Sequence, residues 1–170
     1  MVPGVSQLPD GLSLRPERPA DSAFMARLYH DRRSDLRQID GDPEFVHQLI
    51  DLQQTAQVRG YGDQFPNAMY FVVEKSGEPI GRVCLDFGPN EVRLVDIAFV
   101  AAARGKGYGT AVVKALQMAA TQVRAPLTLA VAANDPAAQR VYARLGFQLE
   151  TSGPMHHYLV WYPALPPITV

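Results

Sequence analysis

The sequence predicts a single α+β domain with a mostly antiparallel sheet, and three observations support this. The chain has 170 residues, the size of one ordinary domain, because two smaller cores would each bury too little apolar surface. The predicted elements follow in the order strand, two helices, three strands, helix, strand, helix, two strands, and consecutive strands favour antiparallel pairing. Only the strands that flank the helix beginning near residue 107 require a crossover, which favours one parallel pair.

The domain is expected to span residues 12–162. Residues 1–11 are rich in Pro and Gly and predict a flexible lead, and residues 163–170 contain three prolines and predict an extended tail. Hydrophobic residues make up 47% of the chain and charged residues 19%, which is the balance of a soluble globular protein.

The first elements are a short strand at residues 12–14 and a helix over 20–33 whose apolar residues recur at helical spacing. A second helix is expected to begin at Asp42 and Pro43, and the glycine at Gly60 ends its pattern.

Three strands follow. Residues 69–74 and 79–87 predict a hairpin that turns at 76–78, where Ser and Gly are found. Residues 91–100 alternate in the manner of a further strand.

The remaining elements are an amphipathic helix that runs to about residue 124, a strand at 127–132, a helix over 135–145 and strands at 147–150 and 157–161. Asp and Pro begin the last helix, and a glycine follows its end.

Charge and composition exclude several classes of protein. The formal net charge is −1 with both signs interspersed, so we expect no nucleic-acid partner and no anionic membrane surface. No segment resembles a secretion signal or a membrane span, and Cys84 is the only cysteine, so we expect a cytoplasmic protein. We expect Cys84 to be a small buried core residue.

The most informative segment is the glycine-rich turn from Arg104 to Thr110, between a strand and a helix. Backbone N–H groups at a helix start, together with the helix dipole, attract an anion, and glycines let a diphosphate approach closely. A Walker loop does not fit, because Gly107 follows Lys106 where Ser or Thr is needed, and the glycine spacing also differs from that of the dinucleotide-binding motif.

The pattern Arg-x-x-Gly-x-Gly, which Arg104, Gly107 and Gly109 supply, resembles the acetyl-CoA pyrophosphate loop of the GNAT acetyltransferases. A second segment, with Asn134 and Tyr142 before a Leu-Gly-Phe sequence, resembles the part of that family after its fifth strand. The resemblance covers residues 12–162. It implies a sheet of six to seven strands with about four helices, in which a parallel strand pair splays apart into a wedge for acyl-CoA.

By this resemblance the chain would use acetyl-CoA as acyl donor, without a metal, and would acetylate the primary amine of a small molecule, an amino acid or a protein. The residues implied to contact the donor are Ile97, Ala98, Phe99, Val100, Arg104, Gly105, Lys106, Gly107, Tyr108, Gly109, Thr110, Asn134, Ala137 and Tyr142. An N–H near Ala98 would polarise the thioester carbonyl.

Two roles in proton transfer have candidates. Tyr142 matches the family tyrosine near the sulfur and is the expected general acid, although its place on an apolar stripe also suits a core residue. For the base, the strand position of the family glutamate is held by Arg93 or Val95. Asp96 is one residue away and would serve only if a bulge re-aims it. Other candidates left open are Glu74, Asp86, His156, His157 and a water chain.

The acceptor side is expected to include Tyr29, Arg33, Tyr61 and Phe65, although the charges near them equally suit a solvated helix face. A domain that binds acyl-CoA as a sensor or scaffold without turnover is the alternative function. A homodimer with Trp161 and Tyr162 at its seam is left open.

Overall fold

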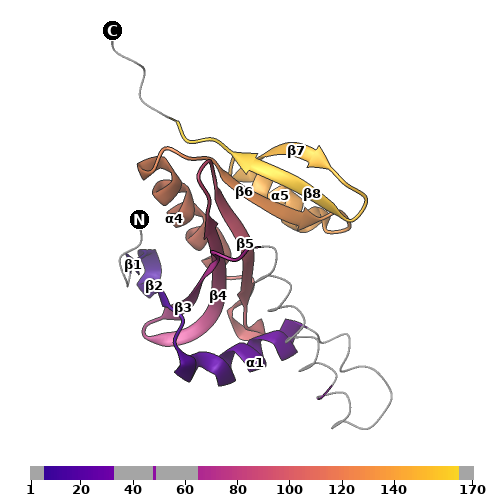
Figure 1. Cartoon of the computed structure of the whole chain (residues 1–170). Helices are drawn as coiled ribbons and strands as arrows, with labels where there is room; N and C mark the ends of the chain where they lie inside the picture. Colours follow the sequence, from indigo (N-terminus) through magenta and orange to yellow (C-terminus); the bar gives the residue numbers. More distant parts are fainter. Residues whose placement is uncertain (1–5, 33–47, 49–64, 165–170) are drawn as a thin grey trace.

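The protein, described as a computed structural model, is defined at residues 6–32, 48 and 65–164. One mixed sheet runs through these residues in the strand order β1-β2-β3-β4-β5-β6-β8-β7. All neighbouring strands are antiparallel except β5 and β6. The predicted fold class is therefore confirmed (Figure 1).

The elements lie close to their predicted positions. They are β1 (Ser6–Gln7), β2 (Leu12–Pro16), α1 (Ser22–Arg32), β3 (Met69–Lys75), β4 (Glu78–Phe87), β5 (Val92–Phe99), α4 (Tyr108–Gln122), β6 (Leu127–Ala132), α5 (Pro136–Arg144), β7 (Gln148–Ser152) and β8 (His156–Trp161). The described part of the chain contains three α-helices, and the helix predicted to begin at Asp42 falls outside it.

The N-terminal segment differs from its prediction. Residues 6–11, expected as a flexible lead, form strand β1 and a short 3-10 turn. Ser6 pairs with Leu14 and Gln7 with Ser13, which satisfies backbone groups on the outer edge of β2. Gly11, with a φ of 74°, permits the tight reversal between them. The sheet thereby gains one strand over the expected six to seven.

Helices cover both faces of the sheet (Figure 1). Helix α1 packs Phe24 and Leu28 against Val72 on one face. Helices α4 and α5 cover the other face, where α4 buries Val112 and Leu116 in the main core. The strands between these layers are therefore buried on both sides, as in a three-layer domain.

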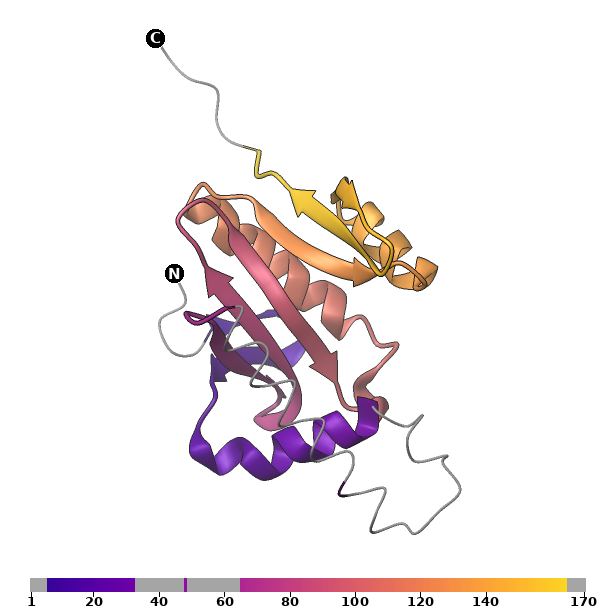
Figure 2. The same cartoon turned by 45° about the vertical axis from the view of Figure 1, so that its right-hand side comes forward.

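The parallel pair β5 and β6 stays together only at its beginning. The paired residues are Val92 with Leu127, Arg93 with Thr128 and Leu94 with Leu129. Strand β5 then continues to Phe99 and β6 to Ala132 without further pairing between them. Figure 2 shows the two strands diverging from this end. The sheet is thus split along half its length, as the resemblance implied.

Candidate active site

A β-bulge in β5 lies where the two strands separate. Across the β4–β5 ladder Leu94 pairs with Leu85 and Asp96 with Cys84, so Val95 is left without a partner. A bulge bends its strand and increases the local twist. The extra residue also changes the alternation, because Leu94 and Ile97 both pack in the core beneath α4, whereas Ala98 packs against α1.

Beyond the bulge, one edge of β5 carries open backbone groups. The Val100 N–H donates to the Ile80 carbonyl at 2.9 Å, and hydrogen-bonded pairs alternate along an antiparallel ladder. Ala98 therefore directs its N–H toward β4, and the N–H groups of Ile97 and Phe99 face the split. The N–H group expected near Ala98 to polarise the thioester carbonyl would therefore belong to Ile97 or Phe99.

The glycine-rich turn forms the start of α4. Gly105 and Gly107 have φ values of 74° and 81°, and a Cβ at either position would meet no atom within 4 Å. Gly107 is the residue that precedes the first turn of α4, so the free N–H groups of that turn follow directly. The turn thus offers positive φ, open space and a helix dipole together, which suits a diphosphate.

A cavity of about 330 Å³ joins this turn to β5 and α5. Six of the predicted donor-binding residues border it: Ile97, Gly105, Gly107, Gly109, Thr110 and Tyr142. Val113, Ala138, Val141 and Leu145 complete its apolar wall. The two segments that the sequence singled out, which lie far apart in the chain, therefore meet at one cavity.

Other predicted donor residues lie around the cavity without bordering it. Arg104 is exposed, and its Nε donates to the Phe99 carbonyl at 3.0 Å, which ties the turn to the end of β5. Val100, Lys106 and Tyr108 border a different cavity of about 530 Å³ near the end of α1.

Asn134 and Ala137 are both exposed at the start of α5. The residue that caps this helix is Asp135, whose Oδ1 accepts from the Ala138 N–H at 3.1 Å. The sequence had left capping open as one role of Asn134, and the neighbouring carboxylate fills it.

Tyr142 is half-buried and stands at the junction of the cavity and the core. Its ring packs edge-on against Phe147, with centroids 5.5 Å apart and an interplanar angle of 73°. Burial raises the pKa of its hydroxyl, and the carboxylates of Asp96 and Asp135 raise it further. Tyr142 is thus a packing residue that borders the cavity and whose raised pKa keeps its hydroxyl protonated at neutral pH.

Asp96 lies on the α1 side of the split sheet. It is buried, and its Oδ2 accepts from Arg82 Nη2 at 3.0 Å. Taking up a proton would break this buried ion pair and leave the guanidinium charge uncompensated. Asp96 is therefore poorly suited to act as a base, although the bulge that its role required is present.

Two of the remaining candidate bases, Glu74 and His157, have side-chain partners, and two are described by their exposure alone. Glu74 binds Arg15 Nε at 2.9 Å, and His157 Nδ1 lies 2.9 Å from the hydroxyl of Ser152. His156 is exposed on β8. Asp86 is half-buried near the end of β4.

Of the expected acceptor-side residues, Tyr29 is buried in α1 and Phe65 is half-buried just before β3. Arg33 and Tyr61 lie outside the described residues. The expectation for Cys84 is confirmed, because it is fully buried and burial raises its thiol pKa to about 11.

Comparison with known proteins identifies the class. The family model described as the acetyltransferase (GNAT) family matches residues 25–147, and the chain belongs to this family. No curated protein matches the chain. None of the helices in the described ranges is long and apolar enough to cross a membrane.

Solved structures share the fold at low identity. An acetyltransferase from Thermus thermophilus is 21% identical, with a TM-score of 0.65 over 92% of this chain and 99% of its own. PaiA N-acetyltransferase from Thermoplasma acidophilum, in complex with coenzyme A, is 12% identical, with a TM-score of 0.65 over 89% and 98%. RimJ from Mycobacterium smegmatis, in complex with CoA-disulfide, is 19% identical, with a TM-score of 0.63 over 94% and 86%.

Proposed function

We propose that the chain is an N-acetyltransferase that transfers an acetyl group from acetyl-CoA to the primary amine of an acceptor by direct attack. The observation that carries this proposal is the single cavity bordered by the glycine turn, β5 at its open edge and Tyr142. Membership of the acetyltransferase family supports it.

The residues at this cavity fit the donor. The N–H groups of the glycine turn would hold its pyrophosphate, and the open N–H groups of Ile97 and Phe99 would hold its pantetheine arm. When bound, acetyl-CoA supplies an acyl carbon that is activated as a thioester. An N–H of this edge would also stabilise the oxyanion that forms during attack.

Tyr142 would give its hydroxyl proton to the departing sulfur. A raised pKa keeps the hydroxyl protonated at neutral pH, which suits a proton donor. The reacting nitrogen, which loses a proton as the amide forms, can return one to the tyrosine.

Thiol release from acetyl-CoA tests the proposal, with a panel of amines, amino acids, polyamines, aminoglycosides and N-terminal peptides. We expect Tyr142→Phe to lower kcat by about 100-fold while CoA affinity is retained. Tyr158→Phe, which changes an exposed tyrosine on β8, is the matched control. Tight CoA binding without turnover would favour the sensor alternative, and absence of CoA binding would contradict both.

A further inference from the structure

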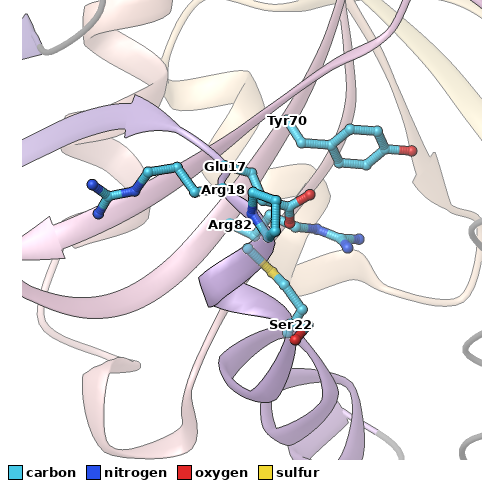
Figure 3. Close-up of a pocket in the computed structure, with 7 residues that line it drawn as sticks. Glu17, Arg18, Ser22, Tyr70 and Arg82 are labelled. Carbon is cyan, nitrogen blue, oxygen red and sulfur yellow. The ribbon is translucent and has the colours of Figure 1, made fainter.

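A third cavity, of about 440 Å³, lies on the face of the sheet that α1 covers. The segment between β2 and α1 forms one wall, and Tyr70 on β3 and Arg82 on β4 form the other. Figure 3 shows that Tyr70 and Arg82 extend to the same side with the Glu17 carboxyl group between them, whereas Arg18 extends away. Glu17, Tyr70 and Arg82 are thus the polar groups that face one another.

Arg82 leaves one hydrogen-bond donor unused at this cavity. The residue is 7% exposed, its Nη2 binds Asp96, and its guanidinium stacks 5.4 Å from the centre of the Tyr70 ring. Its Nε is buried without a hydrogen-bond partner in the described part of the chain. Buried donors in folded proteins are nearly always satisfied, so the Arg82 guanidinium retains the capacity to donate to an oxygen acceptor besides Asp96.

Glu17 supplies the opposite charge. No hydrogen bond or ion pair joins its carboxylate to another residue in the described ranges. Burial raises its pKa, while the charge of Arg82 lowers it and that of Asp21 raises it. Because Asp96 already compensates Arg82, the uncompensated charge belongs to Glu17, and a positively charged group of a ligand is complementary to this carboxylate.

The cavity is one strand away from the open edge of β5. Arg82 pairs with Ala98 across the β4–β5 ladder, where paired Cα atoms lie about 5.5 Å apart. The residues on either side of Ala98, Ile97 and Phe99, direct their N–H groups toward the gap between β5 and β6. A ligand held at Arg82 by one end can therefore reach the reaction edge with its other end through a short flexible stem.

We propose, on the basis of the proposed function, that this cavity holds the zwitterionic head of a diamino acid whose side-chain amine is acetylated. Glu17 binds the α-ammonium group, and the guanidinium of Arg82 binds the α-carboxylate. Met25 and Pro19 give the stem an apolar wall. In the reaction the side-chain nitrogen bonds to the acyl carbon and loses a proton, the C–S bond breaks, and the sulfur gains a proton. The head group is unchanged.

Calorimetry with L-lysine tests binding at the cavity independently of turnover. We expect Glu17→Gln to weaken binding by about tenfold or more, because it removes a charge-assisted contact. Glu150→Gln, which changes an exposed carboxylate on β7, should leave the affinity unchanged. Cadaverine lacks the carboxylate and 6-aminohexanoate lacks the α-ammonium group, so both should bind more weakly than L-lysine. Of these two analogues, only cadaverine has an ammonium group for Glu17, so only cadaverine should bind still more weakly to Glu17→Gln than to the wild type.

Absence of L-lysine binding, or equal binding by wild type and Glu17→Gln, would overturn the inference. Kinetics separate this failure from failure of the proposed function. Turnover of pentylamine with no preference for L-lysine would contradict the head-group pocket and leave the acetyltransferase proposal intact. Failure to consume acetyl-CoA with any amine would contradict the acetyltransferase proposal. Calorimetry with L-lysine would still decide what the cavity binds.

Discussion

At the scale of single residues, Tyr142 and Asp21 illustrate how surroundings set the chemistry of a side chain. Burial raises the pKa of Tyr142, so its hydroxyl keeps its proton at neutral pH. Asp21 accepts hydrogen bonds from both terminal nitrogens of Arg15, at 2.7 and 2.8 Å, which lowers its pKa to about 2. The surroundings of Tyr142 suit proton donation, whereas the ion pair between Asp21 and Arg15 stabilises the fold.

The raised pKa of Tyr142 predicts the alkaline limit of the reaction. A general acid is lost when it deprotonates, so kcat should not fall through loss of this acid until the pH exceeds about 10, the ordinary tyrosine value. The measurement is a kcat profile from about pH 7 to about pH 10.5 in wild type and Tyr142→Phe. A fall in the wild-type profile near pH 8 that disappears in Tyr142→Phe would contradict the assignment.

The lowered pKa of Asp21 predicts a stability that depends on pH. The folded pKa is about 2 and the unfolded value about 3.9, so the carboxylate stabilises the fold above pH 4 and this contribution is lost as the pH falls toward 2. We expect Asp21→Asn to reduce the free energy of unfolding by about 2 kcal/mol at pH 7. Urea unfolding at pH 7 and pH 3 measures the free energy of unfolding of wild type and Asp21→Asn. The difference in this free energy between the two proteins should be smaller at pH 3 than at pH 7.

The residues proposed to bind the donor were predictable from sequence, whereas those of the cavity proposed to bind the acceptor were not. Gly107 and Tyr142 stand in short local patterns, which sequence displays directly. Glu17 and Arg82 come together only through pairing of β2, β3 and β4, and no motif links them. The available signal was an arginine in the middle of the mostly apolar strand segment 79–87, because a buried charge requires a partner.

At the scale of elements, the bulge in β5 determines where the sheet opens. The sequence did not reveal it, because Val92–Phe99 is buried on both faces and its apolar residues therefore do not distinguish one face from the other. The alternation predicted from the sequence assigned side chains to the correct face of the sheet up to Leu94. Beyond Val95 it assigned them to the opposite face. Apart from β1, which was not predicted, the helix and strand positions in the described ranges agreed, because glycine and proline mark their ends.

Deletion of Val95 tests the role of the bulge. Removing the unpaired residue leaves Ile97 beneath α4 and Asp96 beside α1, so the fold should persist. A regular strand would continue to pair with β6 and close the split. We expect CoA affinity to fall by at least about tenfold, measured by calorimetry, with an unchanged circular dichroism spectrum. Wild-type affinity in the deletion variant would contradict this role, and Val123→Ala on the surface provides a control.

At the scale of the whole molecule, the sheet consists of two parts joined by three residue pairs. Strands β1 to β5 form one part and β6, β8 and β7 the other, and α4 packs against both. A donor bound along the open edge of β5 would bridge them. This arrangement followed from the family resemblance, since the splay itself has no local sequence signal.

Hydrogen exchange measures this bridging. In the free protein the amides of Ile97 and Phe99 should exchange faster than that of Ala98, which is paired with β4. CoA should slow exchange at Ile97 and Phe99 and also raise protection in both parts of the sheet, because ligand binding stabilises the folded state as a whole. Protection confined to the glycine turn would argue against a ligand that joins the two parts.

The division of the sheet also bears on how the protein is made. In the part from β1 to β5, each pair of neighbouring strands is also consecutive in the chain. The last residue of this part is Phe99. Because a chain emerges from the ribosome at about 5–20 residues per second, this five-stranded part can assemble before residues 127–161 have been synthesised. Until β6 forms, the nascent part would present the whole edge of β5, including residues 92–94, which β6 later covers. The edge that we propose to hold the donor is therefore exposed during biosynthesis before β6 forms, when it is open to pairing with other chains.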